Sequence, residues 1–459
     1  MPITTSRNRV SSGWWQLVLL SFVLGSEQVC VAQNPPTEIS LGPYEYETKP
    51  EDPAFEKFNP AKAPSVGALL LRSGDKLAIC GDSITEQKMY SRIMETYLTV
   101  CYPELQITCR QYGWSGEKTD GFLRRMDNDC LRFEPTIATL CYGMNDARYR
   151  PFDITNGNWY RDHYTAIVRK FQSADVRVVL GSPGASGRLA TWVKSRSGDL
   201  DEHNLNLCAL RDIAIEVAKN EHCAFADIFW PMYQAQVFGD QRFSTDAEKY
   251  EVAGKDGIHP GWAGQLIMAY AMLRAMGIDG NLGEFEVDLQ AKTATAQHGH
   301  EVQDFDGQTL RIKSNKYPFC AVGPDDKDSS LRSGMQLVPF NDHLNRLTLR
   351  ITNLVSQQAK IRWGNTSLTF SKEELAAGIN LAERFHQNPF SEAFNRVDEA
   401  VYAKQAYETE QIKREFHGPE ARKDIEKVVR DTEAKRTPLA AAIQSAMQPI
   451  EHELEIVPL

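Results

Sequence analysis

The sequence predicts an α/β protein in which an open parallel sheet carries helices on both faces. Between about residues 67 and 278, short apolar runs alternate with helix-like stretches. Several of these runs end in glycine and polar residues. From about residue 281 the pattern changes to alternating β runs and then to charged helical sequence. Strand–helix alternation is typical of a parallel sheet whose functional groups gather at the carboxyl ends of the strands.

Each expected element of this domain rests on its own pattern. Five apolar runs are the expected strands, at residues 76–80, 105–109, 136–141, 176–181 and 223–229. Helix-like segments lie between them, around residues 86–100, 117–128, 159–173 and 203–220. A last helix is expected to begin near Pro260, because proline is favoured in the first turn of a helix.

Two further regions follow the α/β domain, which is expected to span residues 67–280. Residues 281–370 contain runs that alternate between apolar and polar residues, with a turn signal at Gly364-Asn365, and predict a small antiparallel β region. Residues 371–459 are charged, with apolar residues at helical spacing, and predict a helical hairpin that runs to the end of the chain. Such an apolar stripe is usually a packing face, and this region is a candidate surface for a protein partner or a second copy of the chain.

The first 66 residues have the composition of a leader and a tether. Residues 1–32 place two arginines before an apolar run and small residues after it, which is typical of a signal peptide, here cleaved after Ala32. The apolar run is shorter than the ~20 residues that a membrane-spanning helix needs. We therefore expect a secreted or periplasmic protein, in which the proline-rich residues 33–66 form a tether.

The charge balance excludes some partners. The chain has 459 residues, with 51 basic and 61 acidic side chains and a net charge of −10. Neither nucleic acid nor an anionic membrane surface is therefore an expected partner. The nine cysteines, of which Cys30 lies in the leader, include no C-x-x-C pair or zinc spacing. Cys101 and Cys109 flank one loop and are the candidate disulfide pair.

The segment CGDSITEQ, residues 80–87, follows the first expected strand and admits two interpretations. Ser83 and Glu86 read S-x-x-E, the capping box that begins many helices. In the other interpretation Ser83 is a nucleophile, which requires a base to accept its proton and donors to stabilise the oxyanion. The choice depends on the rest of the chain.

Other expected strand ends supply the remaining parts of such a site. In Asp256-x-x-His259 one loop holds both side chains, so the carboxylate can accept the imidazole Nδ1–H and leave Nε2 facing a serine. The backbone N–H groups of Ser83 and Gly113 and the side-chain NH₂ of Asn145 are the expected oxyanion donors. Taken alone, the Asn145 block could be a plain turn and Asp256 a helix cap. Their common position at strand ends that a parallel sheet brings together favours catalysis.

These blocks resemble those of the SGNH hydrolases, also called the GDSL esterase and lipase family. The family's serine, glycine, asparagine and histidine blocks are matched in order, over roughly residues 74–278, by Gly81-Asp82-Ser83, Gly113, Gly143-x-Asn145-Asp146 and Asp256-x-x-His259. Ile84 stands where the family's name-giving motif has leucine. This apolar replacement leaves the chemistry untouched.

The resemblance implies a flavodoxin-like three-layer α/β/α fold and the activity of a carboxylic ester hydrolase. It implies that Ser83 is the nucleophile, His259 the base and Asp256 the residue that orients the base. It also implies an oxyanion hole formed by Ser83, Gly113 and Asn145, and no metal or cofactor. The resemblance covers less than half of the chain and says nothing of residues 281–459.

Two functions of other classes compete with the esterase interpretation. In a metallophosphoesterase, Asp82, Asn145, Asp146 and His259 would bind metal, but paired metal sites need more histidine and aspartate ligands than these loops supply. The second alternative is a binding protein with an inactive hydrolase domain and a partner-binding helical region. The complete set of serine, histidine and aspartate argues against it.

Within the esterase class, we expect removal of short acyl groups, acetyl foremost, from carbohydrate. The predicted export places the protein where polysaccharides are met, and the sequence has no evident long apolar lid to shield extended acyl chains. Aromatic residues near the expected strand ends offer flat rings to sugars, although any one of them is more often core packing: Trp114, Tyr142, Tyr149, Trp159, Trp192 and Trp262. A lysophospholipase or an arylesterase of the same family is the alternative.

Overall fold

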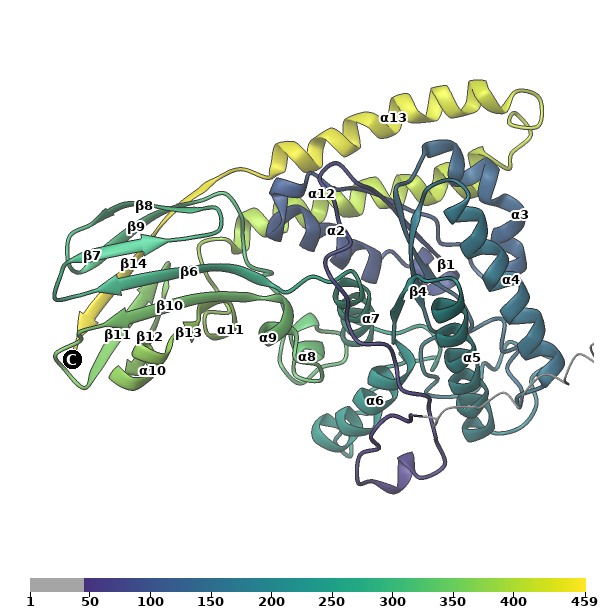
Figure 1. Ribbon diagram of the computed structural model, residues 1–459, viewed down its shortest axis with the longest axis horizontal. Helices are drawn as coiled ribbons and strands as arrows, with labels where there is room; N and C mark the ends of the chain where they lie inside the picture. Colours follow the sequence, from purple (N-terminus) through teal and green to yellow (C-terminus); the bar gives the residue numbers. More distant parts are fainter. Residues whose placement is uncertain (1–44) are drawn as a thin grey trace, which may run out of the picture. The chain divides into compact units, whose positions relative to one another are not determined.

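The central sheet of the α/β domain has the predicted parallel arrangement in the computed structural model, which describes residues 45–459 (Figure 1). Its strands are β1 (Lys76–Gly81), β2 (Thr108–Gln111), β3 (Ile137–Cys141), β4 (Arg177–Gly181) and β5 (Ala224–Ala226). They pair in the order β2-β1-β3-β4-β5, and every neighbouring pair is parallel. Each of the five expected apolar runs contributes one of these strands, which confirms the predicted fold class.

The strand order reverses between β1 and β3. The chain passes from β1 to β2 at one edge and then returns to place β3 on the other side of β1. In open parallel sheets, ligands bind beside the carboxyl ends of the strands at such a point. β3 is buried along its whole length, as expected for a strand that is covered on both faces.

Helices cover both faces of this sheet (Figure 1). One face carries α3 (Thr119–Asp129), α4 (Ile154–Gln172) and α5 (Leu200–Asn220), and the other carries α2 (Tyr90–Cys101), α6 (Phe229–Phe243) and α7 (Trp262–Ala275). The turn α1 (Ser83–Glu86) follows β1. The expected helix-like segments all correspond to helices of this set. The sequence did not predict α6, because its apolar start reads as the end of a strand.

The described part of the expected tether is packed against the α/β domain. Phe55 and Phe58 are fully buried, and their rings contact Trp230 and Tyr233 of α6. The tether prediction is therefore wrong for this part, because proline and charge dominate its composition while two phenylalanines anchor it.

The predicted signal peptide, residues 1–32, lies outside the described residues. Within residues 45–459, no helix combines the length and the apolar character needed to cross a membrane.

Two accessory sheets follow the α/β domain. Their strands are β6 (Asn281–Asp288), β7 (Thr293–Ala296), β8 (His300–Phe305), β9 (Thr309–Ser314), β10 (Arg346–Thr352), β11 (Gln358–Trp363), β12 (Thr366–Ser371), β13 (Ile379–Asn380) and β14 (Ile450–Pro458). The first sheet has the order β13-β10-β6-β7 and the second β12-β11-β14-β9-β8. The connections contain α8 (Leu331–Met335), α9 (Phe340–Leu344), α10 (Lys372–Ala377) and α11 (Leu381–Arg384). β9, β10 and β11 bury every second residue, which is why alternation predicted this region.

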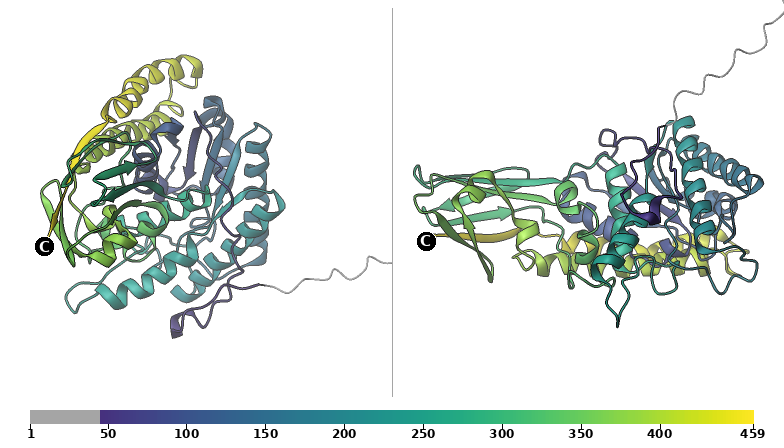
Figure 2. Two further views of the ribbon diagram at one scale, coloured as in Figure 1. Left: turned by 60° about the vertical axis from the view of Figure 1, so that its left-hand side comes forward. Right: turned by 90° about the horizontal axis from the view of Figure 1, so that it is seen from below.

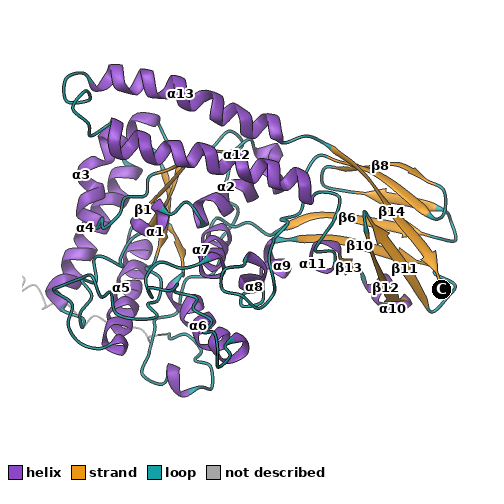
Figure 3. Cartoon of the chain, turned by 180° about the vertical axis from the view of Figure 1, so that it is seen from behind, coloured by secondary structure: helices purple, strands orange, loops and turns teal. Residues whose placement is uncertain are grey.

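A helical hairpin lies against the α/β domain, as Figures 1 and 3 show from opposite sides. It consists of α12 (Ser391–Glu410), which continues into the π-helical turn η4 (Gln411–Glu415), and of α13 (Ile425–Ala446). α12 packs against α13 and also contacts α2 and β2. The charged sequence of this region therefore does form the expected pair of helices.

The chain differs from the sequence prediction in two further respects. β6 and β10 pair in parallel, so the first accessory sheet is mixed rather than antiparallel. After α13 the chain forms β14, the yellow strand that leads to the C-terminus in Figure 2. This strand lies between β9 and β11 in the second sheet. The prediction that the helical hairpin runs to the end of the chain is therefore wrong for the last residues, which form β14. Leu454 and Ile456 are buried there between more exposed glutamates.

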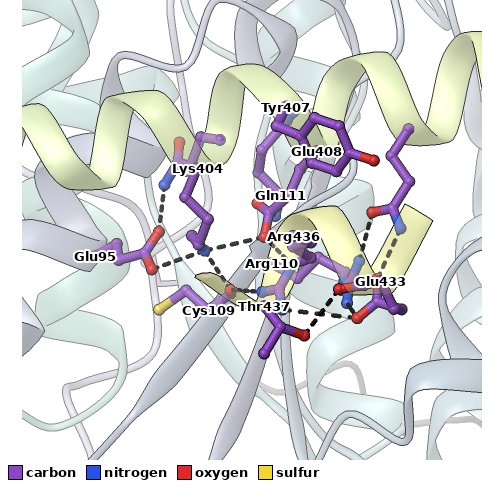
Figure 4. Close-up of polar contacts among 12 residues, drawn as sticks. Glu95, Cys109, Arg110, Gln111, Lys404, Tyr407, Glu408, Glu433, Arg436 and Thr437 are labelled. Atoms are coloured by element: carbon purple, nitrogen blue, oxygen red, sulfur yellow. Dashed lines mark hydrogen bonds and ion pairs between the residues drawn. The ribbon is translucent and has the colours of Figure 1, made fainter. Parts of the chain in front are cut away.

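Charged side chains of the hairpin cover the edge strand β2 (Figure 4). Lys404 Nζ donates to the Cys109 carbonyl at 2.6 Å and lies 2.8 Å from Glu95 and 3.0 Å from Glu408. The Gln111 N–H donates to Glu408 Oε2 at 3.1 Å. Because an edge strand leaves backbone groups unpaired, these side chains take the place that a sixth strand would occupy.

All eight cysteines of residues 45–459 are free thiols. The expected pairing of Cys101 with Cys109 is therefore wrong. Cys101 lies on α2 near Lys316, whereas Cys109 lies on β2 near Lys404, so the two thiols face different neighbours.

Candidate active site

Ser83 is the first residue of α1, directly after β1. Asp82 is the N-cap residue, and its Oδ1 accepts a backbone N–H of the first turn at 3.0 Å. The capping box expected from S-x-x-E does not form, because the Glu86 carboxylate binds Ser115 and Lys413 instead. With Asp82 capping the helix, the Ser83 hydroxyl is left for another partner.

That partner is His259, which lies in the loop before α7. His259 Nε2 is 2.8 Å from Ser83 Oγ, and His259 Nδ1 is 2.7 Å from Asp256 Oδ2. The fold thus brings together Ser83, His259 and Asp256 as the sequence predicted, although Ser83 and His259 are 176 positions apart.

Hydrogen bonds keep the Asp256 carboxylate charged. Burial opposes its ionisation, but the backbone N–H and the imidazole of His259 and the backbone N–H of Ile258 lower the pKa of Asp256 below its ordinary value. A charged Asp256 accepts the Nδ1–H, which leaves Nε2 free to accept the Ser83 hydroxyl proton.

Gly113 packs directly on α1. A Cβ atom at this position would lie 2.2 Å from the backbone nitrogen of Glu86, so a side chain would force the loop away from the helix that begins with Ser83. The Gly113 N–H donates to Gln111 Oε1 at 2.9 Å. An oxyanion would therefore compete with the Gln111 amide for this donor.

Asn145 follows β3 and faces Asp82. Its Nδ2 donates to Asp82 Oδ2 at 3.2 Å and to the Glu117 carbonyl at 3.1 Å, while the Tyr149 hydroxyl donates to its Oδ1 at 3.1 Å. Two of the three expected oxyanion donors thus already have partners within the chain. A bound substrate must share these donors with their present partners or displace those partners.

Two acidic side chains near the candidate site, Asp82 and Asp146, are buried. Burial raises the pKa of Asp82 to about 7, and the nearby carboxylates of Asp146 and Glu117 act in the same direction. Burial also raises the pKa of Asp146 to about 6, although Thr119 and Gly143 donate hydrogen bonds to it. These groups titrate near neutral pH.

The six expected aromatic residues have different neighbours. Trp192 is 52% exposed and stacks on His259 with ring centroids 5.9 Å apart. Tyr149 is buried and bonds to Asn145. The others contact neighbouring side chains: Trp114 with His417, Tyr142 with Glu117, Trp159 with Arg148 and Trp262 with Arg92. Trp192 is therefore the best placed of the six to contact a substrate.

Sequence reasoning missed several residues that shape the site. Gln111 and Glu117 bond to the expected oxyanion donors, and Lys413 reaches Glu86 from the helical hairpin. Gln111 and Glu117 lie beside the glycine block but carry no motif of their own. No local signal marks Lys413, because its partner lies 327 positions away.

In the part of the chain that the structure describes, no group of three or more histidine, cysteine, aspartate or glutamate side chains is arranged to hold a metal ion. Of the four side chains that a metallophosphoesterase would use, Asp82 and Asn145 hydrogen-bond each other, and His259 bonds to Ser83.

Both the sequence and the fold are similar to those of known proteins. Residues 79–267 match the GDSL-like Lipase/Acylhydrolase family. An acetylxylan esterase from Geobacillus stearothermophilus is 22% identical over 233 residues, which cover 45% of this chain and 96% of that protein.

Among solved structures, BT4096, a gut microbial diltiazem-metabolizing enzyme, aligns with a TM-score of 0.67 at 19% identity. The alignment covers 86% of this chain and 100% of that one. The likeness in fold therefore extends beyond the α/β domain into the accessory regions. The segment of residues 79–267, which holds Ser83 and His259, is a domain of the GDSL-like lipase/acylhydrolase (SGNH) family, and the protein is a carboxylic ester hydrolase.

Proposed function

We propose that the protein removes short acyl groups, acetyl foremost, from carbohydrate through an acyl-enzyme on Ser83. The observation that carries this proposal is the chain of two hydrogen bonds from Asp256 through His259 to Ser83 in a domain of an esterase family. A serine hydroxyl needs such a base, because it is a weak nucleophile when protonated.

In the acylation step, Ser83 Oγ attacks the ester carbonyl while His259 Nε2 takes the hydroxyl proton. Asp256 stabilises the resulting imidazolium through its bond to Nδ1–H. The tetrahedral intermediate then releases the alcohol, which takes its proton from His259. In the deacylation step, His259 takes a proton from water and the resulting hydroxide attacks the acyl carbonyl. Ser83 Oγ then takes that proton back from His259 as the carboxylic acid leaves.

The oxyanion is stabilised by the backbone N–H groups of Ser83 and Gly113 and by the side-chain NH₂ of Asn145. All three follow strands β1, β2 and β3, whose carboxyl ends lie side by side. The Gly113 N–H exchanges the neutral amide oxygen of Gln111 for the oxyanion, since a charged acceptor forms the stronger hydrogen bond. The Asn145 side chain exchanges its bond to the Asp82 carboxyl for one to the oxyanion.

Three observations support the acetyl and carbohydrate assignments. The related acetylxylan esterase is named for such a substrate. The exposed Trp192 beside His259 offers a flat ring on which a sugar can stack. The leader-like residues 1–32 support action outside the cytoplasm, where polysaccharides are met.

A fluorophosphonate probe tests the assignment of the nucleophile. We expect mass spectrometry to find the adduct on Ser83, and we expect His259→Asn to abolish labelling because the base is lost. His298→Asn changes an exposed histidine of the accessory region and should label like the parent protein. An adduct on another serine, or undiminished labelling of His259→Asn, would overturn the proposal.

A substrate panel tests the acyl group and the alcohol. Acetate release from acetylated xylan and small acetylated sugars is compared with fatty-acid release from lysophospholipid and with hydrolysis of aryl esters, using Ser83→Ala as the blank. We expect acetylated carbohydrate to give the highest kcat/KM. A preference for chains of about eight carbons or more, each methylene contributing ~0.8 kcal/mol on burial, would favour the lysophospholipase alternative.

A further inference from the structure

The end of α12, the turn η4 and the residues after it contact the loop that carries Gly113. We call residues 408–417 the C-terminal clamp and residues 112–117 the oxyanion loop. The clamp belongs to the helical hairpin, far from the family motifs in sequence, yet several of its side chains reach this loop or the residues that flank it.

Glu86 connects the clamp to both halves of the candidate site. It is the last residue of the helix that Ser83 begins, and its Oε2 accepts hydrogen bonds from the backbone N–H and the hydroxyl of Ser115 in the oxyanion loop. Lys413 Nζ lies 2.8 Å from both carboxylate oxygens of Glu86. A single carboxylate thus ties the nucleophile's helix to the oxyanion loop, and a lysine of the clamp holds that carboxylate.

The Glu86 carboxylate is charged in this setting. Burial opposes its ionisation, but the hydrogen bonds from Lys413 and Ser115 lower its pKa below the ordinary value. The two side chains are mostly buried, with 26% of Lys413 and 20% of Glu86 exposed. Removal of Lys413 would leave this shielded carboxylate with the hydrogen bonds from Ser115 and the nearby charge of Lys88 but without its direct ion pair, which is unfavourable.

Two side chains of the clamp also contact Trp114, the residue after Gly113. His417 meets the Trp114 ring edge-on with centroids 5.0 Å apart, and Lys413 Nζ lies 5.6 Å from the ring centre. His417 Nε2 is in turn 2.9 Å from Asp129 Oδ2 of α3. These contacts fix one side of the oxyanion loop against the hairpin.

A further link reaches Gly113 itself from the start of the clamp. The Gln111 side-chain amide donates to Thr409 Oγ1, and its Oε1 accepts the Gly113 N–H at 2.9 Å. The Gln111 backbone N–H donates to Glu408 Oε2 at 3.1 Å. The orientation of the proposed oxyanion donor therefore depends on side chains of the clamp.

We infer that Lys413 is a positioning residue, which acts through Glu86 to hold the oxyanion loop at the distance from Ser83 that catalysis requires. This inference rests on the proposed function, because it assigns the loop's N–H group to the oxyanion. Oxyanion stabilisation depends on donors that are already oriented, so a small displacement of the loop lowers kcat more than it changes KM.

Kinetics of matched variants test the inference. We expect Lys413→Met to lower kcat by about 10-fold or more with KM nearly unchanged, and Lys413→Arg to restore much of the loss because it keeps the charge. Arg414→Met is the control, since Arg414 is 77% exposed and pairs with Glu410 within the same segment. Glu86→Gln should lose activity like Lys413→Met, and the double variant should lose little more, because the two act as a unit.

Hydrogen–deuterium exchange of residues 112–117 provides a readout that does not depend on activity. We expect the loop to exchange about 10-fold faster in Lys413→Met and at the parent rate in Arg414→Met. If Lys413→Met does not fold, Glu86→Gln, which has nearly the same shape, gives the same comparison.

The outcomes separate this inference from the proposed function. Unchanged exchange of the loop, or a folded Lys413→Met whose kcat stays within about twofold of the parent, would overturn the positioning role. A parent protein that reacts with neither esters nor the fluorophosphonate would instead overturn the proposed function.

Discussion

Asp82 makes two hydrogen bonds that shape the site, yet it is buried where a charged carboxylate is unfavourable. It caps the helix that Ser83 begins, and it accepts a hydrogen bond from Asn145, so its position is needed. It is also almost completely buried, which disfavours its charged form. The raised pKa of Asp82, about 7, is the result of this burial.

This raised pKa predicts how stability depends on pH. In the unfolded chain Asp82 ionises near its ordinary pKa of 3.8, so between about pH 4 and 7 the folded state binds more protons than the unfolded state. The contribution of Asp82 to stability is therefore fully present below about pH 4 and is lost as the pH rises through about 7. Asp146, with a pKa of about 6, acts in the same direction.

We therefore expect Asp82→Asn to flatten, without abolishing, the fall of the unfolding free energy over this range. Denaturant unfolding at several pH values measures the slope, and the exposed Asp127→Asn serves as the control. A slope that is the same in the parent and in Asp82→Asn would contradict the assignment.

At the scale of elements, the helical hairpin covers the edge of β2 that pairs with no other strand of the sheet. The Cys109 carbonyl accepts hydrogen bonds from Lys404 at 2.6 Å and from Arg436 at 3.1 Å, one from each helix of the hairpin (Figure 4). Lys404 and Arg436 both also contact Glu408, which is fully buried. The side chains of this network therefore provide hydrogen-bond partners for backbone groups of the edge strand.

Lys404→Met is therefore expected to destabilise the protein by about 3–5 kcal/mol, because it leaves Glu95 and Glu408 buried without their shared counter-ion. Denaturant unfolding provides the measurement. Lys423→Met removes a lysine that is 71% exposed and paired with Glu420, so it should leave the stability unchanged. Equal stability of the two variants would contradict a structural role for the network.

At the scale of the whole described molecule, the last strand closes the second accessory sheet. β14 lies between β9 and β11, so the hairpins β8–β9 and β11–β12 are joined only through it. The strand follows α13, the outer helix of the hairpin, which packs against α12. The end of the chain thus links the accessory sheets to the hairpin.

We expect deletion of residues 448–459 to lower the midpoint of thermal unfolding by at least about 10 °C, since it removes two strand pairings and exposes the apolar faces that they cover. Calorimetry measures the shift. Residues 1–32 form the predicted leader, and their removal provides the matched control, which should melt like the full chain. A soluble variant without β14 that melts at the parent temperature would contradict the prediction.

A chain that ends near Gly280 would lose more than the accessory sheets. Glu95 would lose its partner Lys404, Arg110 would lose its partner Glu433, and the edge of β2 would be open to solvent. The α/β domain holds the candidate nucleophile and base, but the hairpin completes its core.

The sequence by itself determined the fold class of the α/β domain and identified Ser83, His259 and Asp256 as a group. Strands and helices are marked by local periodicity, and parallel topology brings residues at strand ends to one edge of the sheet. Local patterns also explain the errors. The period-two alternation of β14 is present in the sequence, but it follows a long charged helix so closely that the pattern predicts one continuous helical region.

Only the tertiary structure decided how the second half of the chain serves the first. The pairing of Lys413 with Glu86 joins residues 327 positions apart, and that of Lys404 with the Cys109 carbonyl joins residues 295 positions apart. From the sequence, a charged residue on a helix is expected to face solvent. The reason is that periodicity shows which face of a helix is apolar but not which other surface the helix packs against. Such pairs become visible only when packing has brought the two surfaces together and excluded water from between them.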